Sequence, residues 1–512
     1  MRAIVSVHDK SGLAEFARGL AALGVEMYST GGTHAALDKA GVAVKSISDL
    51  TGFPEILDGR VKTLHPRVHG GILGRRELES HREEMKKQDI EPIDLVAVNL
   101  YPFVWTVTQA GVTLEEALEN IDIGGPTMIR AAAKNFPNVL VVVDPEDYEP
   151  VLEQLRAGKV SLAERQRLAQ KAFQHVAHYD TAISQYLRGP EAILPASFSI
   201  ALTKVADVRY GENPHQRGAF YAEESVLNPE PGGMTSAVQL HGKEMSYNNY
   251  LDADAAWVAA WDFKEQTVVI VKHTNPCGLA SHDDLPEAYR RAFAGDPVSA
   301  FGGIIAINRT VTLEAAEEIG KVFFEVIIAP DYEEEALAFL RKKRDLRILA
   351  AAPPSLDDLE YRRVVGGLLV QERDNILDEE ELIKESLNVV TTRQPTAAEL
   401  GDLLFANRVV KHVKSNAIVF VKDRALMGMG AGQPNRVTSV MLAARAAGDK
   451  AKGAVLGSDA FFPFPDGVET AATAGITAVI QPGGSIRDAE AIAAADAAGM
   501  AMVFTGRRHF KH

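Results

Sequence analysis

The sequence has 512 residues, enough for two to four domains, and its hydrophobic content of 46% is that of an ordinary globular protein. The formal charge of −15 argues against a general nucleic-acid binder and against a protein that binds anionic membranes. Small anionic ligands remain compatible with this charge, because they need only a local basic pocket.

No apolar run approaches about 20 residues, so no membrane span is expected. The opening residues read as a strand and not as a signal peptide. Cys277 is the only cysteine, which excludes an intrachain disulfide and a Cys-x-x-Cys metal site. These features predict a protein of the reducing cytoplasm.

Strands and helices alternate in the first third of the chain. An amphipathic helix is expected up to Leu23, and Thr30-Gly-Gly-Thr33 opens a second helix that stops at Gly41. Strands are predicted over residues 3–7, 25–29, 94–100 and 139–143. This alternation is typical of a parallel sheet covered by helices on both faces.

The pattern changes after about residue 145. Ser161 and Glu164 have the spacing of a capping box, which opens a long helix to about Leu187. Gly189-Pro190 and Pro195 indicate a linker. We therefore expect a first domain over residues 1–145, a helical connector over 146–199 and a second region over 200–512.

The second region is also predicted to be α/β. Thr396 and Glu399 form another capping box in its middle. No sequence repeat is apparent, but the length favours two subdomains divided near residues 355–395. Strands are expected near residues 268, 304, 326, 346, 417, 454, 478 and 501.

Two segments of the first third have the residue types of a phosphate site. Thr30-Gly-Gly-Thr33 lies between a strand and a helix, where glycines let the backbone come close and helix amides bind anions. The basic segment 60–69 strengthens this interpretation, although alone it also fits a solvated loop. His65 and His69 have the spacing of a metal pair, but Pro66 lies between them and no third ligand is evident.

Further polar residues follow. Tyr101 lies at a strand end, and Asp122 precedes a helix, where a structural N-cap is an equally open role. Arg130 and Lys134 lie on one face of that helix. The alanines between them leave small apolar surroundings, so a partly desolvated Lys134 could act in acid–base chemistry.

Six motifs occur in one order over residues 1 to about 145: Ser-Val-x-Asp-Lys, Thr-Gly-Gly-Thr, Arg-Val-Lys-Thr-Leu-His-Pro, Asn-Leu-Tyr-Pro-Phe, Asp-Ile-Gly-Gly and Ala-Ala-Ala-Lys-Asn. They resemble the inosine monophosphate (IMP) cyclohydrolase domain of the bifunctional purine-biosynthesis family, whose fold is similar to methylglyoxal synthase. His8 departs from the pattern, because some relatives carry serine there. The resemblance implies that a nucleotide phosphate is held by Ser6, Asp9, Lys10, Thr30, Gly31, Gly32, Thr33, Arg60 and Thr63. It also implies that the closing ring is surrounded by Lys62, Tyr101, Asp122 and Lys134.

The implied reaction is a dehydrative ring closure. The carboxamide nitrogen of a formylated aminoimidazole nucleotide attacks the formyl carbon, and water leaves. A carboxylate, a phenol and lysines in one pocket suit the proton transfers at both atoms. Which group is the acid and which the base is left open by the sequence.

In the second region, an apolar strand over residues 268–271 ends at Lys272 and His273. Ligands of open α/β sheets bind at the carboxyl ends of strands, so these residues could supply a cation and a proton acceptor. Adjacent strand residues point to opposite faces, and the turn expected at Asn275-Pro276 could bring the pair together. Pro276-Cys277 is similar to part of a zinc deaminase motif, but the second cysteine is missing.

Other runs are individually compatible with ordinary turns and packing. Arg209-Tyr210 precedes a polar turn, Ser299–Gly303 precedes a strand, and Asn416 lies at the start of one. Arg436 follows a glycine-rich loop, and Phe461–Phe464 is an aromatic cluster suited to stack on a flat ring.

Together with Arg508-His-Phe510, these runs resemble the transformylase region of the same family, from about residue 200 onward. The region acts on aminoimidazole carboxamide ribonucleotide (AICAR), and its two subdomains are similar in fold to cytidine deaminase without the zinc. The implied reaction is formyl transfer from 10-formyltetrahydrofolate to the 5-amino group of AICAR. His273 suits the general base, Lys272 the stabilising cation and Asn416 an oxyanion donor. The other residues expected to bind substrates are Arg209, Tyr210, Asn249, Phe301, Gly302, Arg436, Phe461, Arg508 and Phe510.

Two alternatives stay open. One is a single-activity transformylase with a nucleotide-sensing first domain, and the other is a non-catalytic nucleotide-binding scaffold. A sensor would need the phosphate cradle but not Tyr101, Asp122 and Lys134 together. The resemblance further implies a homodimer that binds AICAR, formyl-AICAR, IMP and reduced folate, and it implies no metal for catalysis and no nucleic-acid or membrane partner.

Overall fold

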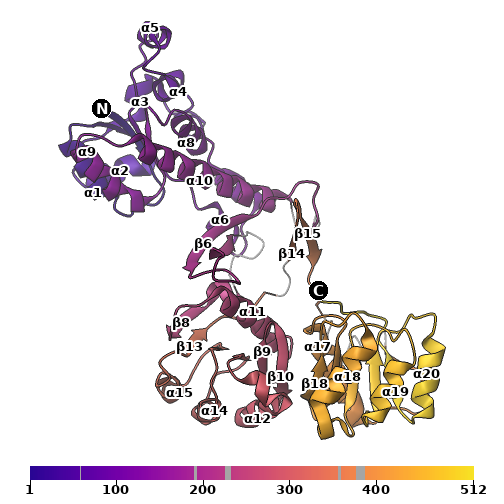
Figure 1. Cartoon of the computed structure of the whole chain (residues 1–512). Helices are drawn as coiled ribbons and strands as arrows, with labels where there is room; N and C mark the ends of the chain where they lie inside the picture. Colours follow the sequence, from indigo (N-terminus) through magenta and orange to yellow (C-terminus); the bar gives the residue numbers. More distant parts are fainter. Residues whose placement is uncertain (58, 189–192, 225–231, 356–358, 376–386) are drawn as a thin grey trace. The chain divides into compact units, whose positions relative to one another are not determined.

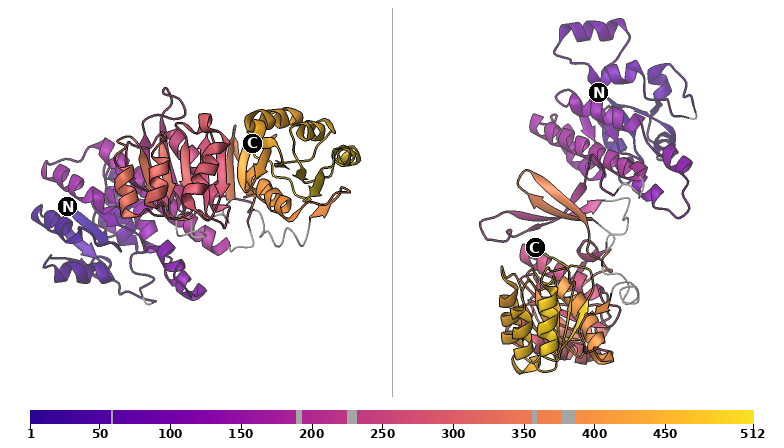
Figure 2. Two further views of the ribbon diagram at one scale, coloured as in Figure 1. Left: turned by 90° about the horizontal axis from the view of Figure 1, so that it is seen from below. Right: turned by 90° about the vertical axis from the view of Figure 1, so that its right-hand side faces the viewer.

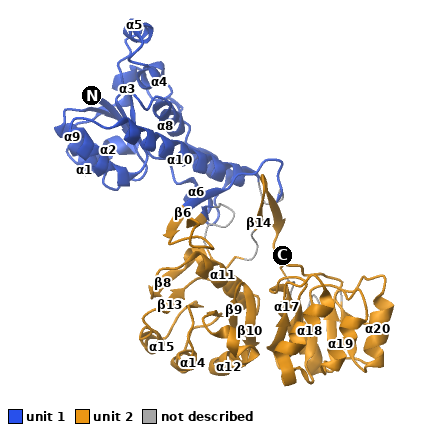
Figure 3. Ribbon diagram, in the orientation of Figure 1, with its two compact units in different colours: residues 1–203, 223–229 blue, residues 204–222, 230–512 orange. Residues whose placement is uncertain are grey.

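The computed structural model describes residues 1–57, 59–188, 193–224, 232–355, 359–375 and 387–512. The chain divides into two compact units (Figure 3), of which unit 1 comprises residues 1–203 and 223–229 and unit 2 comprises the rest. Gly189-Pro190, on which the predicted linker rests, lies outside the described residues, as does part of the predicted division near 355–395. In the described ranges, no helix is both long enough and apolar enough to cross a membrane.

Unit 1 is built on a five-stranded sheet in the order β3-β2-β1-β4-β5. All its strand pairs are parallel, which confirms the predicted sheet type. The chain runs from β1 outward to β3 and then returns to the other side of β1, so a topological switch point lies between β1 and β4. The strands are β1 (Arg2–Ser6), β2 (Glu26–Ser29), β3 (Lys45–Ser46), β4 (Leu95–Val98) and β5 (Leu140–Val142).

Helices of unit 1 pack their buried apolar residues against this sheet, whereas the helix Glu79–Lys87 has no buried residue. The predicted long helix is present as α10, whose first turn is capped by Ser161 Oγ accepting from Glu164 N at 3.1 Å. Its buried face, including Leu168 and Val176, joins the core of the sheet, and α10 packs along α8 (Figure 1). The helices are α1 (Leu13–Ala22), α2 (Gly31–Lys39), α3 (Ile47–Thr51), α4 (Pro66–Leu73), α5 (Glu79–Lys87), α6 (Phe103–Val107), α7 (Leu114–Glu119), α8 (Gly124–Lys134), α9 (Tyr148–Arg156) and α10 (Leu162–Arg188).

Unit 2 contains a twelve-stranded sheet in the order β16-β21-β20-β19-β17-β18-β10-β9-β11-β12-β13-β8. All eight strands expected from the sequence are present, and β8, β10, β16 and β18 are additional. The strands are β8 (Val238–His241), β9 (Thr267–Lys272), β10 (Asn275–Ser281), β11 (Ile304–Ile307), β12 (Val326–Ala329), β13 (Arg347–Ala350), β16 (Asn388–Val389), β17 (Ile418–Lys422), β18 (Ala425–Gly430), β19 (Val455–Ser458), β20 (Ala478–Gln481) and β21 (Ala501–Phe504).

The twelve-stranded sheet contains one topology twice, although no repeat is apparent in the sequence. Strands β10-β9-β11-β12-β13 form the first copy, and β18-β17-β19-β20-β21 form the second. Each copy begins with an antiparallel hairpin and continues with parallel strands. The copies join where β10 pairs with β18 at Ala280 and Ala425.

Helices cover both faces of this sheet. One face carries α11 (Tyr247–Trp261) and α17 (Ala397–Lys411), which share one apolar core across the two copies. In β9, Val269 and Val271 face that core, while Val268 and Ile270 face the other side, as strand geometry requires. The opposite face carries α12 (Leu285–Gly295), α14 (Leu313–Ile319), α15 (Glu334–Leu340), α18 (Arg436–Ala447), α19 (Asp466–Thr473) and α20 (Asp488–Ala497).

Two hairpins lie outside the large sheets. They pair β6 (Ala201–Val208) with β7 (Gly218–Glu224) and β14 (Leu359–Val364) with β15 (Gly367–Glu372). Both are visible in the right-hand view of Figure 2. The pair β14–β15 is antiparallel, and the sequence predicted neither hairpin.

Candidate functional sites

The first candidate site lies at the carboxyl end of β1, where the structure gathers the predicted phosphate cradle. Ser6 Oγ and Thr30 Oγ1 are 2.9 Å apart. Thr33 Oγ1 accepts from Val7 N at 3.0 Å and donates to the Val7 carbonyl at 2.9 Å. These bonds fix the start of α2, where Gly31 and Gly32 are exposed residues in the first turn of the helix, a place where backbone amides can bind an anion.

Asn99 fixes the other side of this site, at the switch point between β1 and β4. Its Oδ1 accepts from His8 N at 2.6 Å and from Asp9 N at 3.0 Å, and its Nδ2 donates to the Asp9 carbonyl at 3.2 Å. Asp9 in turn accepts from Ser11 N at 2.8 Å. Asn99 was not among the predicted site residues, and its position directly after a buried strand could have identified it.

Lys62, Thr63 and Asp122 come to the same end of the sheet. A Cβ on Gly31 would lie 3.9 Å from Lys62 Nζ, and one on Gly124 would lie 2.5 Å from Thr63 Oγ1. Burial raises the pKa of Asp122, opposed by the hydrogen bond from Gly125 N and the charge of Lys62. Asp122 is therefore a carboxyl group that can hold a proton more readily than an exposed one.

The loop that carries Asp122 is held by the long helix α10. Tyr179 Oη accepts from Asp122 N at 2.8 Å and donates to the Asn120 carbonyl at 3.2 Å. Tyr101 is exposed nearby on the β4 side, with its ring 5.2 Å from the ring of His8. Tyr179 belongs to the predicted connector over residues 146–199, so this connector positions the candidate catalytic group Asp122.

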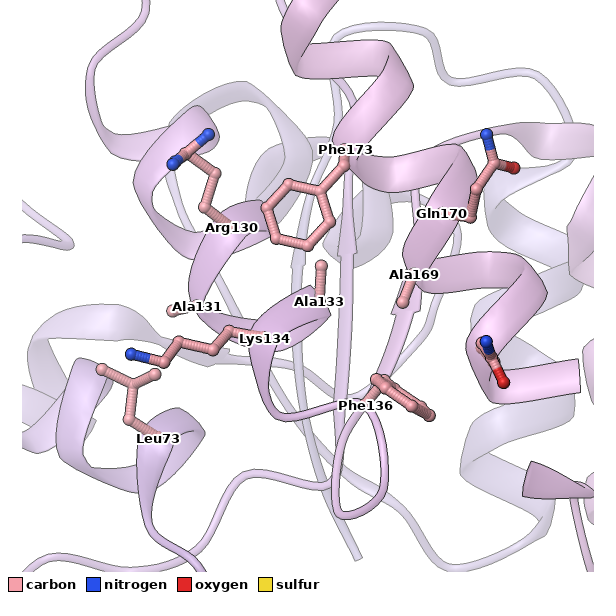
Figure 4. Close-up of a pocket in the computed structure, with 10 residues that line it drawn as sticks. Leu73, Arg130, Ala131, Ala133, Lys134, Phe136, Ala169, Gln170 and Phe173 are labelled. Carbon is pink, nitrogen blue, oxygen red and sulfur yellow. The ribbon is translucent and has the colours of Figure 1, made fainter. Parts of the chain in front are cut away.

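Two predicted residues of unit 1 differ from expectation. Lys134 was expected to be partly desolvated, but its side chain is exposed at the last position of α8. Asp122 precedes the first position of that eleven-residue helix, so about 15 Å of helix separates them. Lys134 instead lines a surface pocket of about 590 Å³ with Arg130 and Phe173 (Figure 4). Arg60 is exposed and forms an ion pair with Glu119.

The second candidate site lies at the hairpin between β9 and β10. The predicted strand end is confirmed, but the turn is formed by His273 and Thr274, and Asn275-Pro276 already belongs to β10. Lys272 Nζ donates to the Phe301 carbonyl at 2.8 Å, next to Gly302. The His273 side chain is exposed.

Asn416 comes from the second copy of the topology. Its Nδ2 donates to the Gln433 carbonyl at 2.7 Å, and its Oδ1 accepts from Arg436 at 2.8 Å. Arg436 was expected to face a phosphate or a carboxylate of the substrate. It is instead buried and ion-paired with Asp459, so its charge holds Asn416 in place.

Asn275 joins the two halves of this site. Its Nδ2 donates to the His273 carbonyl at 3.0 Å, and its Oδ1 accepts from Lys414 N at 3.1 Å. The Lys272-His273 turn and the segment before Asn416 are thus tied together by one side chain. Residues 139 positions apart in the sequence meet because β10 and β18 pair in the middle of the sheet.

Several other predicted residues are exposed aromatic and cationic groups. The Arg209 guanidinium lies 4.8 Å from the Tyr210 ring centre, and that of Arg508 lies 4.4 Å from the Phe510 ring centre. The exposed ring of Phe301 packs on Phe323 at 5.4 Å. Phe461 is 38% exposed. Asn249, by contrast, is part of the capping box of α11, in which its amide oxygen accepts from the N-cap residue.

Family models match both parts of the chain. A model described as "MGS-like domain" matches residues 12–127, and one described as "AICARFT/IMPCHase bienzyme" matches residues 132–446. The chain belongs to the AICARFT/IMPCHase bienzyme family. The first match falls on the parallel sheet of unit 1, which agrees with the expected methylglyoxal-synthase-like fold.

Relatives within the AICARFT/IMPCHase bienzyme family are similar over their whole length. "Bifunctional purine biosynthesis protein PurH" of Acetivibrio thermocellus is 53% identical, with 100% of this chain and 99% of the relative covered. The protein of the same name from Listeria welshimeri is 52% identical, with both chains covered completely. A solved structure described as "Crystal structure of ForH" is 42% identical over 36% of this chain and 95% of its own, with a TM-score of 0.34.

Proposed function

We propose that the chain catalyses two consecutive reactions of purine synthesis, each in its own unit. Unit 2 transfers a formyl group from 10-formyltetrahydrofolate to the 5-amino group of AICAR, and unit 1 closes formyl-AICAR to IMP. The observation that carries this proposal is the presence of two separately built polar sites in a chain of the bienzyme family. One contains Lys272, His273 and Asn416, and the other contains Lys62 and Asp122 beside a phosphate cradle.

In formyl transfer, the 5-amino nitrogen attacks the formyl carbon, and the bond from that carbon to the folate nitrogen breaks. His273 takes the proton of the amine, and Lys272 stabilises the tetrahedral oxyanion. The leaving folate nitrogen takes up one proton as its bond to the formyl carbon breaks, with Lys272 stabilising it. An amide nitrogen carries two hydrogens, so Asn416 can donate one to the oxyanion while the other bonds Gln433. The buried Arg436–Asp459 pair keeps that amide in one orientation.

Binding of the two substrates is assigned to cationic and aromatic side chains of unit 2. Arg209 and Arg508 suit the nucleotide phosphate and the folate carboxylates, because guanidinium groups bind such anions through two hydrogen bonds. Tyr210, Phe301, Phe461 and Phe510 offer flat surfaces for the heterocycles. We assign Arg436 and Asn249 to positioning instead, since both are occupied by contacts within the chain.

In ring closure, the carboxamide nitrogen attacks the formyl carbon and loses one proton. The formamide nitrogen loses a second proton as it forms a double bond to that carbon, and the oxygen takes up both protons and leaves as water. Asp122 and Tyr101 can exchange these protons, and Lys62 stabilises the developing negative charge. Ser6, Thr30, Thr33 and the backbone of the exposed residues Gly31 and Gly32 at the start of α2 hold the phosphate. Lys134 is left out of this group, because it lies at the far end of α8.

We also propose that the protein works as a homodimer in the cytoplasm. The absence of any cysteine pair in the sequence supports a reducing compartment. Sedimentation of the purified chain tests the dimer, which is contradicted by a monomer at micromolar concentration.

The proposal is tested with two assays on the purified full chain. The first supplies AICAR with 10-formyltetrahydrofolate, and the second supplies formyl-AICAR alone. IMP is expected in both. IMP in neither would contradict both activities, whereas formyl-AICAR as the only product of the first assay would show a single-activity transformylase.

A further inference from the structure

Each copy of the unit 2 topology has its own aspartate, at an equivalent position, whose carboxylate binds the backbone of a hairpin turn. Asp252 is the sixth residue after the cap of α11, and Asp402 is the sixth after the cap of α17. Asp252 accepts from Thr274 N at 2.7 Å and from His273 N at 3.3 Å. Asp402 accepts from Asp423 N at 2.9 Å and from Arg424 N at 2.8 Å.

The turns that these carboxylates hold are left-handed. The φ angles are 53° and 59° at His273 and Thr274, and 51° and 53° at Asp423 and Arg424. Two-residue hairpin turns of this kind favour Asn-Gly, because side chains with a Cβ disfavour positive φ. Neither turn contains glycine or asparagine, so a carboxylate that binds both turn amides compensates for the unfavourable conformation.

In the first copy, the turn determines where a candidate catalytic group points. Successive residues of a regular strand face opposite sides, so Lys272 and His273 could not share a site on a straight β9. The left-handed turn interrupts that alternation directly after Lys272. The His273 peptide is held at its N–H by Asp252 and at its carbonyl by Thr274 Oγ1 at 2.8 Å and Asn275 Nδ2 at 3.0 Å.

We propose that Asp252 is the positioning residue for His273 in formyl transfer, an inference that rests on the proposed function of unit 2. Its carboxylate bonds the backbone of the turn and thereby fixes the backbone from which the imidazole extends, directly after Lys272. Asp402 does the same for a turn without a candidate catalytic group. Because β10 and β18 are antiparallel, that second turn lies at the opposite ends of the strands from His273. There Arg424 pairs with Glu265 at 3.7 Å.

The chain therefore supplies its own matched control. Asp252→Asn and Asp402→Asn each replace one acceptor oxygen of an equivalent turn by an NH₂ group. We expect Asp252→Asn to lower kcat of formyl transfer by about 100-fold. A loss of this size is typical when a catalytic group is displaced by about 1 Å. KM for AICAR should change by less than about threefold, because the residue bonds the turn and not the substrate. Asp402→Asn should lower thermal stability similarly and leave kcat within about twofold of wild type.

A second variant separates turn geometry from loss of charge. Glycine adopts positive φ readily, so Asp252→Asn/Thr274→Gly should regain at least about tenfold of the lost kcat. If Asp252→Asn alone does not fold, kcat is measured on the double variant, in which glycine relieves the unfavourable turn conformation. The inference is overturned by a kcat of Asp252→Asn within twofold of wild type, by an equal loss in Asp402→Asn, or by failure of the glycine to restore activity. Lack of formyl transfer in the wild-type chain would instead contradict the proposed function.

Discussion

The surroundings of Asp122 change the pKa of its carboxyl group. The hydrogen bond from Gly125 N and the nearby charge of Lys62 favour the ionised form, but burial outweighs both and raises the pKa. A carboxyl group of raised pKa can give and take protons nearer neutral pH than an exposed aspartate. Tyr179 fixes the loop that carries it, so the group has one defined position.

Asp122→Asn should therefore lower the rate of ring closure by about 10²–10⁴-fold, the usual contribution of a general acid or base. Formyl transfer should be unchanged, because it takes place in unit 2. In wild type, the rate of ring closure against pH should show an inflection above the ordinary aspartate pKa of about 3.9, and the variant should lack it. Asp49→Asn is the control, because Asp49 carries the same charge in the cap of α3. Equal losses in both variants would contradict the role of Asp122.

Glycines in β10 and β18 show how closely helices approach the repeated hairpins. A Cβ on Gly278 would lie 2.1 Å from the Ala292 carbonyl oxygen of α12, and one on Gly428 would lie 2.4 Å from the Ala443 carbonyl oxygen of α18. The two positions are equivalent in the two copies of the topology. Both contacts are with helix backbone, which cannot move without displacing the helix.

Gly278→Ala and Gly428→Ala should each lower the free energy of unfolding by about 1–3 kcal/mol, the usual effect of overpacking. Gly401 provides the control, because a Cβ there would meet nothing within 4 Å. Since Gly401 lies inside α17, its change to alanine should raise the stability by about 0.5–1 kcal/mol. Urea unfolding of the three variants measures these differences. Stabilisation by either strand substitution would show that the approach of strand and helix is looser than described.

A buried charge cluster connects the ends of α11 and α17. Asp262 accepts from Lys411 Nζ at 2.9 Å and lies 2.8 Å from His412 Nε2. Burial lowers the pKa of His412 to about 4, although Asp262 opposes this shift. The pKa of Asp262 is lowered, because His412 and Lys411 outweigh its burial. At neutral pH Asp262 is therefore ionised and His412 is a neutral imidazole.

The stability of unit 2 should fall as the pH drops from about 6.5 to about 4. In that range the unfolded chain binds a proton at His412 and the folded chain does not, so protonation favours unfolding. The effect of this one group is on the order of 3 kcal/mol at most. His412→Gln should flatten this part of the curve of unfolding free energy against pH. An unchanged slope would show that His412 is not buried in its neutral form.

At the scale of the whole molecule, much of the fold could be predicted from hydrophobic patterns. All eight strands expected in unit 2 are present, because each is a short apolar run that ends in polar residues. β10 was missed because Pro276 suggested a turn, whereas a bulge between Pro276 and Gly278 accommodates it within the strand. The repeated topology was missed because the copies share few side chains besides the caps, Asp252 and Asp402, and the glycines.

The candidate sites were predictable where residues follow strand ends. Thr30 and Lys272 were found in this way, because carboxyl ends of strands gather at one edge, whereas Ser6 was expected only from the family resemblance. Burial and ion pairing were not predictable, and they change the interpretation of Arg436, which supports Asn416 instead of facing a ligand. For Lys134 the motif was present, but the length of α8 places it away from Asp122.

The central claim is that one chain contains two independent catalytic sites, joined by formyl-AICAR as a shared intermediate. Two variants test it most directly, His273→Ala in unit 2 and Asp122→Asn in unit 1. With AICAR and 10-formyltetrahydrofolate, His273→Ala should form no product, and Asp122→Asn should accumulate formyl-AICAR. An equal mixture of the two variants should again produce IMP, because each supplies the step that the other lacks. Failure of the mixture to produce IMP, with both variants folded, would contradict two independent sites.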